Sequence, residues 1–154
     1  MTSFQNILVP IDFGDAMQPA IDLAVSLASK LDARLTLVNA FDMTPFMIAT
    51  PYAPPIDMEP TVEAMERALR DVAAEVRKAW GKTESVLVRG TPMDVILETA
   101  AARGCDLIVI GSHGRHGFAR VMLGSIAEKV VRFSPLPVLT VHPVRRRDTK
   151  RSAA

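Results

Sequence analysis

Cysteine, aromatic residues and long apolar runs are all scarce in this sequence. Its 154 residues include one cysteine, Cys105, which excludes a disulfide within the chain. A chain of this length buries about two thirds of its unfolded surface, so it does not need a disulfide for stability. Aromatic residues make up 5% of the chain and hydrophobic residues 49%, so we expect a core of Val, Ile, Leu, Ala and Met.

No apolar run approaches the length of a membrane-spanning helix. The N-terminus also lacks the pattern of a signal peptide, because the apolar run at residues 7–11 is short and has no basic lead. We therefore expect a cytoplasmic protein with no membrane partner. Cys105 comes just before the apolar run at 107–110, which favours a buried small side chain over a redox thiol.

Charge is balanced overall, with a net charge of +1, but it is concentrated at the end of the chain. Residues 145–154 contain five of the 18 basic residues and one of the 17 acidic residues. A basic tail can contact nucleic acid or anionic lipid, yet no basic surface interleaved with aromatics accompanies it, so nucleic acid is not an expected partner. We expect residues 1–144 to form a single domain and 145–154 a disordered tail.

Five short apolar runs alternate with segments of helical periodicity. The runs cover residues 7–11, 35–40, 86–88, 107–110 and 138–141. The helices are expected from Pro19 to Leu31, over 62–80, from a Thr91 cap to Gly104, and over 125–133. Strands that are apolar on both faces and separated by helices predict an α/β fold with helices on both faces of a parallel sheet. Right-handed crossovers favour a doubly wound open five-stranded parallel sheet in the order 3-2-1-4-5.

That strand order reverses the chain between the first and fourth strands, and ligands bind such sheets at the carboxyl ends beside the reversal. The first strand ends at Pro10 and Asp12, and the fourth opens into Gly111 and Ser112. One connection, residues 42–59, is unusually long and holds four prolines and three methionines. We expect it to be a partly ordered flap.

Four of the eight glycines fall in the stretch from Gly111 to Ser125. Between a strand and a helix, such residues let backbone N–H groups approach phosphate oxygens, and the helix N-terminus adds partial positive charge. The stretch lacks the lysine of a Walker A loop and the spacing of a dinucleotide fingerprint. What remains is G-x-x-G, nine residues, then G-S, formed by Gly111, Gly114, Gly124 and Ser125.

This pattern and its flanks resemble the universal stress protein family, in particular its nucleotide-binding branch. The resemblance covers nearly the whole chain, through ILVPIDF, LTLVNAFD, VRGTPMDVILETAARGCDLIVIGSHGR and LGSIAEKVVRFSPLPVLTV. It implies a fold like that of the adenine nucleotide alpha hydrolases and an ATP-type ligand with Mg²⁺. It also implies a homodimer formed by antiparallel pairing of the last strand, Val138 to Val141.

The resemblance further implies which residues bind the nucleotide. They are Pro10, Asp12, Ala40, Gly111, Ser112, His113, Gly114, Arg115, Gly124, Ser125 and Ile126. The first three would surround the base and ribose, residues 111–115 would wrap the phosphates, and the last three would bring the final helix to the phosphate oxygens. Mg²⁺ would be held mainly by the phosphates, with Asp12 as a candidate ligand. Two positions depart from the common pattern: Ala40 replaces a bulkier aliphatic residue, and Asn39 stands where many members have His.

Three functions remain open on the sequence. The first is an ATP-binding, nucleotide-responsive stress or signalling module with at most slow hydrolysis, because no general base for a γ-phosphate is evident. The second is a Mg²⁺-dependent ATPase that uses Asp12, and the third is a nucleotide-free dimeric interaction module. His113 and His116 lack a third metal ligand at a suitable spacing, and Met17 is interpreted as an ordinary core or surface residue.

Overall fold

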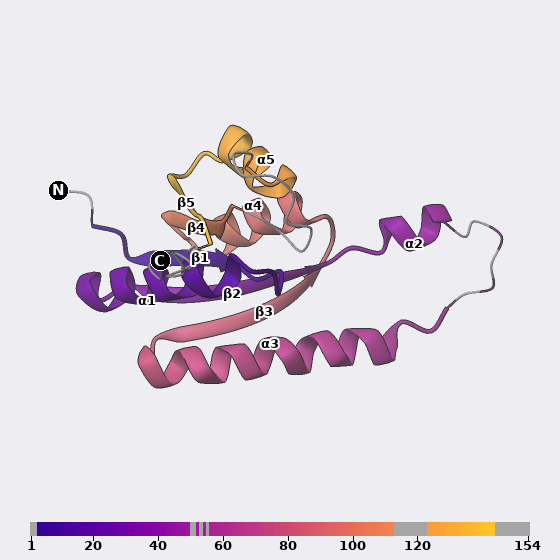
Figure 1. Ribbon diagram of the computed structural model, residues 1–154, viewed down its shortest axis with the longest axis horizontal. Coiled ribbons are helices and arrows are strands. Elements are labelled where there is room, and N and C mark those ends of the chain that lie inside the picture. Colours follow the sequence, from indigo (N-terminus) through magenta and orange to yellow (C-terminus); the bar gives the residue numbers. More distant parts are fainter. Residues whose placement is uncertain (1–2, 50–51, 53, 55, 113–122, 144–154) are drawn as a thin grey trace, which may run out of the picture.

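Five parallel strands form one sheet in the order β3-β2-β1-β4-β5 in the computed structural model (Figure 1). The structure describes residues 3–49, 52, 54, 56–112 and 123–143. The elements are β1 (Asn6–Pro10), α1 (Met17–Leu31), β2 (Arg34–Phe41), α2 (Thr44–Ala49), α3 (Glu59–Ala79), β3 (Thr83–Arg89), α4 (Pro92–Ala102), β4 (Leu107–Gly111), α5 (Ser125–Phe133) and β5 (Val138–Val141). The predicted fold class and strand order are confirmed.

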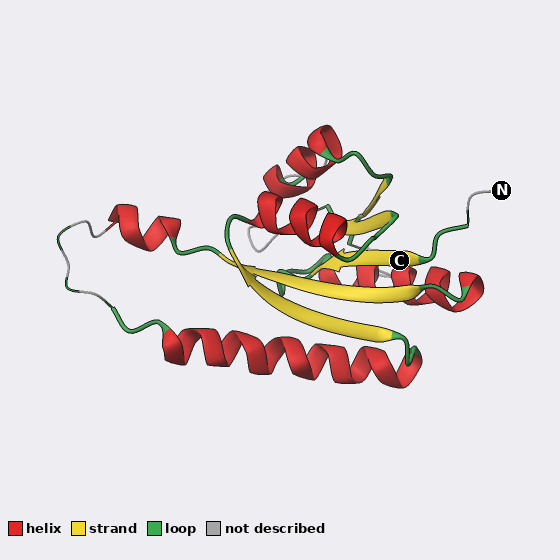
Figure 2. Cartoon of the chain, turned by 180° about the vertical axis from the view of Figure 1, so that it is seen from behind, coloured by secondary structure: helices red, strands yellow, loops and turns green. Residues whose placement is uncertain are grey.

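Helices cover both faces of the sheet, as Figure 2 shows with α4 and α5 on one side and α3 on the other. Side chains alternate between the faces along each strand. Val9 and Leu37 therefore join the core beneath α1 and α3. Leu8 and Val38 join a second core beneath α4 and α5. All four side chains are fully or almost fully buried, which explains why adjacent positions of these strands are both apolar.

Helix α3 begins at Glu59, three residues before the predicted start, and two other helix starts differ in detail from the prediction. Helix α1 begins at Met17, two residues before Pro19. A proline is tolerated in the first turn because the N–H that it lacks would have no acceptor within the helix. Thr91 occupies the N-cap position of α4, but its hydroxyl donates to the Asp94 carboxylate at 2.6 Å and caps no backbone N–H. The sequence thus located the start of α4 correctly and the hydrogen bond incorrectly.

Strand β3 is longer than the apolar run at 86–88 that predicted it. It starts at Thr83 and pairs along its whole length with β2, from Leu35 opposite Thr83 to Phe41 opposite Arg89. Because β3 lies at the edge of the sheet, its polar side chains can remain partly exposed. Residues such as Glu84 therefore continue the strand without contributing to an apolar run.

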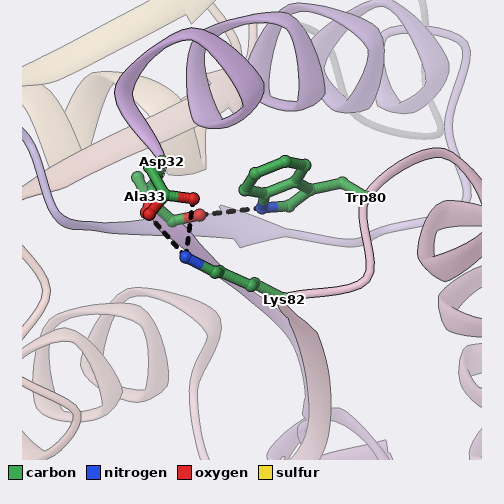
Figure 3. Close-up of polar contacts among 4 residues, drawn as sticks. All are labelled: Asp32, Ala33, Trp80 and Lys82. Atoms are coloured by element: carbon green, nitrogen blue, oxygen red, sulfur yellow. Dashed lines mark hydrogen bonds and ion pairs between the residues drawn. The ribbon is translucent and has the colours of Figure 1, made fainter.

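Two turns are joined at the amino edge of the sheet (Figure 3). The Trp80 indole N–H donates to the carbonyl of Ala33 at 2.7 Å, and the Lys82 ammonium donates to the Asp32 carboxylate at 2.6 Å. The ion pair is exposed and contributes little, whereas the indole bonds a carbonyl of the fully buried Ala33. These contacts fix the end of α3 to the start of β2, far from the carboxyl ends of the strands.

The connection between β2 and α3 leaves the body of the protein, and α2 lies well to one side in Figures 1 and 2. The expected flap thus contains a six-residue helix. Several of its large apolar side chains are exposed, including Met47 and Ile48. None of the described helices is long and apolar enough to span a bilayer.

Cys105 is buried beneath α4 and α5. Burial, together with the neighbouring Asp106 carboxylate, raises the pKa of its thiol to about 11. The thiol is therefore protonated at neutral pH, and the protonated form is the weaker nucleophile. This environment favours the interpretation of Cys105 as a small buried side chain.

Candidate functional site

A cavity of about 430 Å³ opens at the carboxyl edge of the sheet, where β1 and β4 lie side by side. Eight of the eleven predicted site residues line it. They are Pro10, Asp12, Ala40, Gly111, Ser112, Gly124, Ser125 and Ile126. The other three, His113, Gly114 and Arg115, lie outside the described residues. Segments more than a hundred residues apart in the sequence therefore meet around one space.

The turn after β1 forms a tightly held wall of the cavity. Phe13 has a φ of 59°, a left-handed conformation that is rare for a residue with a side chain. Two contacts stabilise it: the Asp12 carboxylate accepts a hydrogen bond from the N–H of Gly14 at 2.8 Å, and the Phe13 side chain packs on the core beneath α1 and α3. The N–H of Ile11 also donates to the carbonyl of Val38 at 2.7 Å. The turn thus places Asp12 at the cavity.

The opposite wall joins the end of β4 to the start of α5. The N–H of Gly124 donates to the carbonyl of Ser112 at 2.5 Å, and α5 begins at the next residue. No described side chain caps the first turn of α5. The N–H groups of a first helical turn have no acceptor within the helix, and they carry the positive end of its dipole. Because Ser125 and Ile126 line the cavity, an anion would be stabilised at this wall.

Gly111 is required by packing, which the sequence interpretation did not foresee. A Cβ atom there would lie 2.7 Å from the Cβ of Ala16 and 2.9 Å from its carbonyl oxygen. The missing side chain therefore allows the end of β4 to approach the start of α1. This close approach brings β4 next to the turn that carries Asp12.

Apolar side chains complete the cavity. Val38 and Ala40 line it from β2, and Val95 and Ile96 line it from α4. The small side chain at Ala40 leaves room that a bulkier aliphatic residue would fill. A flat heterocycle fits such walls, because ligand pockets are mostly apolar with a few placed polar groups. One cavity thus combines an apolar region with the start of α5, whose first N–H groups have no acceptor within the helix.

Sequence reasoning missed several contributors, among them two methionines and a histidine. Met17 of α1 and Met65 of α3 both line the cavity, so Met17 is more than an ordinary core or surface residue. His142 contacts Ser112, with its Nδ1 atom 2.8 Å from the serine Oγ. Ser112 follows Gly111, and His142 follows the Val141 that pairs with Gly111. The register of β4 and β5 is therefore the signal that places these two side chains together.

A second, more open depression of about 760 Å³ lies at the amino edge. Three of its charged residues form ion pairs: Lys82 bonds Asp32, and Glu84 bonds Arg103. Open parallel sheets bind ligands at the other edge, so we assign the candidate site to the smaller cavity. No group of three His, Cys, Asp or Glu residues that could hold a metal ion occurs among the described residues.

Comparison with known proteins agrees with the fold. The model of the universal stress protein family matches residues 3–142. The chain belongs to the universal stress protein family. Among its relatives, YxiE of Bacillus subtilis is 35% identical over 147 residues, which covers 90% of this chain and 99% of YxiE. A universal stress protein of Methanocaldococcus jannaschii is 31% identical over 140 residues, or 90% of this chain and 82% of the relative.

Solved structures of universal stress proteins share the same architecture. One of them, determined in complex with cAMP, is 26% identical with a TM-score of 0.69. The match covers 93% of this universal stress protein and 100% of the other chain. The resemblance noted in the sequence is therefore confirmed at the level of the family.

Proposed function

We propose that this universal stress protein binds an adenine nucleotide, ATP in particular, in the carboxyl-edge cavity and acts as a nucleotide-responsive stress or signalling module. The observation that carries the proposal is that one cavity pairs an apolar slot with the start of α5, which no described side chain caps. The first region suits the base, and the second suits phosphate oxygens. A relative of the same fold, 26% identical, was solved in complex with the adenine nucleotide cAMP, which supports the proposal.

In this proposal Pro10, Asp12 and Ala40 border the base and ribose, while Ser112, Gly124 and Ser125 face the phosphates. Mg²⁺ would be carried mainly by the phosphates. Asp12 is the one carboxylate among the described cavity-lining residues, so it is the protein's candidate ligand for the ion. His113, Gly114 and Arg115 belong to the proposed phosphate site on the strength of the sequence motif.

Hydrolysis should be slow at most. Efficient phosphoryl transfer needs a positioned nucleophile and transition-state charge in addition to bound nucleotide, and the described cavity residues supply no evident base for a water molecule. Titration of the purified protein with ATP should show binding, and steady-state turnover should stay far below ~1 s⁻¹, the low end for enzymes. Rapid turnover abolished by Asp12→Asn would instead favour an Asp12-dependent ATPase. Absence of binding would favour a nucleotide-free interaction module.

We also propose a cytoplasmic homodimer. Strand β5 pairs with β4 on one side and ends the sheet on the other, and such an edge is a template for pairing with a second chain. Its Leu139 is exposed, as are Val131 and Phe133 on the adjacent α5. Antiparallel pairing of two β5 strands would cover these side chains. In the same proposal residues 1–144 form one domain followed by a basic tail.

Leu139→Lys should raise the dissociation constant of this dimer about tenfold or more. Each chain would contribute one lysine to the paired β5 strands, and the two like charges would repel each other. Leu23→Lys is the matched control, because Leu23 on α1 is nearly as exposed as Leu139, at 36% against 38%. Sedimentation of both variants across a range of concentrations measures the effect. A wild-type protein that sediments only as a monomer at micromolar concentration would contradict the proposed dimer.

A further inference from the structure

Asn39 presents an amide to the cavity in an unusual environment. Its side chain is 5% exposed and belongs to the cavity wall. It lies two residues after Leu37 on β2, so it points to the sheet face covered by α1 and α3. The amide nitrogen donates a hydrogen bond to the carbonyl of Ile11. Because that carbonyl can only accept, the amide nitrogen must face Ile11 and the amide oxygen must face away from it.

The Oδ1 atom of Asn39 has no hydrogen-bond partner among the residues that the structure describes. Among the described residues it is the one buried side-chain nitrogen or oxygen left without a partner. Other buried polar side chains are satisfied: Thr36 bonds Glu84, and Thr83 bonds the carbonyl of Trp80. Buried polar groups are nearly always hydrogen-bonded, and an unsatisfied acceptor destabilises the protein. A cavity wall is the place where a ligand can supply the missing donor.

We propose that Asn39 determines base specificity: its Oδ1 accepts a hydrogen bond from the exocyclic amino group of a 6-aminopurine, so that the site favours adenine over 6-oxopurines. This inference rests on the proposed nucleotide-binding function. Neighbouring side chains of a strand point to opposite faces, so Val38 and Ala40 line the cavity on the α4 side of β2, and Asn39 lines it on the side of α1 and α3. In this proposal the base lies at the carboxyl end of β2, where the two parts of the cavity meet. An oxopurine would set a carbonyl oxygen against Oδ1, and two acceptors repel.

Access to the buried oxygen requires a small rearrangement. Met17 and Met65 line the cavity from α1 and α3, the helices that cover the face to which Asn39 points. Methionine side chains are unbranched and repack readily. Entry of a base can therefore uncover Oδ1 by a change of methionine rotamer, without movement of the strands. The cost of the buried acceptor in the free protein is then recovered when the amino group binds.

The first measurement compares three triphosphates on the wild-type protein by calorimetry: ATP, purine riboside triphosphate and inosine triphosphate. Purine riboside lacks any group at position 6, and inosine carries an oxygen there. We expect ATP to bind roughly tenfold more tightly than purine riboside triphosphate, and inosine triphosphate to bind more weakly still. Equal affinity for ATP and purine riboside triphosphate would overturn the inference while leaving nucleotide binding intact. Failure to bind all three would overturn the proposed function together with the inference.

The second measurement assigns the selectivity to Asn39. In Asn39→Leu the three affinities should converge to within about threefold, because the acceptor is removed. Asn39→Val, a β-branched residue that suits a strand, also removes the acceptor and serves if the leucine variant does not fold. Thr36→Val changes a buried polar side chain of β2 outside the cavity lining and should retain wild-type selectivity. An unchanged preference for ATP in the Asn39 variants would overturn the inference. It would also be overturned if these variants changed the affinity for a nucleotide with deoxyribose as its sugar but not the affinities for nucleotides with an altered base.

Discussion

Replacing Ser125 with glutamate is expected to weaken ATP binding by at least about 100-fold without unfolding the protein. Ser125 is the first residue of α5 and lines the cavity at the wall rich in backbone N–H groups. A carboxylate there would occupy the region proposed for the phosphates and repel them. The same carboxylate interacts favourably with the helix dipole, by about 0.3–1 kcal/mol. Thermal unfolding should therefore show an unchanged or slightly raised Tm, while calorimetry shows the loss of binding.

A matched control separates this local effect from a general effect of charge. Ser29→Glu makes the same chemical change at an exposed site far from the cavity. Ser29 lies near the C-terminal end of α1, at the amino edge of the sheet. This variant should bind ATP as the wild type does. If Ser125→Glu also bound ATP normally, the start of α5 could not be the phosphate site, and the proposed function would lose its main support.

Gly111→Ala should lower the free energy of unfolding by about 1–3 kcal/mol, as overpacking of a closely packed site does. The added Cβ would lie 2.7 Å from the Cβ of Ala16 and 2.9 Å from its carbonyl oxygen. The carbonyl oxygen belongs to the backbone, so it cannot move aside as the end of a flexible side chain can. Gly111→Val should cost more, because two further methyl groups enter the same space. Urea denaturation measures the change as a shift in the midpoint.

Gly81→Ala is the control for this substitution, since no heavy atom lies within 4 Å of the Cβ it would add. Its stability should stay within about 0.5 kcal/mol of the wild type. Ala16→Gly, combined with Gly111→Ala, should restore part of the loss, because one of the two clashes is with the Ala16 methyl group. Equal stabilities of Gly111→Ala and Gly81→Ala would show that the β4–α1 approach is looser than the structure indicates.

The fold could be predicted from the sequence because its central strands are apolar on both faces. Residues such as Leu8 and Val9 are both fully buried, under different helices, and this leaves an uninterrupted apolar run in the sequence. The same rule failed at β3, where an edge position allows Glu84 to stay half exposed. Periodicity reports burial, so it locates central strands better than edge strands.

The candidate site could be predicted only in part. Residues at strand ends and helix starts, such as Asp12 and Ser125, follow from topology, because the carboxyl ends of parallel strands converge. The contact between Ser112 and His142 depends on strand register, and the unsatisfied oxygen of Asn39 depends on which amide group faces Ile11. Such features arise from pairs of residues distant in the sequence, and no local pattern encodes them.

The left-handed turn at Phe13 makes one side of the cavity resistant to movement. The ring of Phe13 packs on the core beneath α1 and α3, and the backbone of the same residue forms the bend that places Asp12 at the cavity. Displacing that bend would pull an aromatic ring out of its packing. Adaptation to ligands of different size is therefore expected from the unbranched side chains of Met17 and Met65, which line the same cavity, and not from this turn.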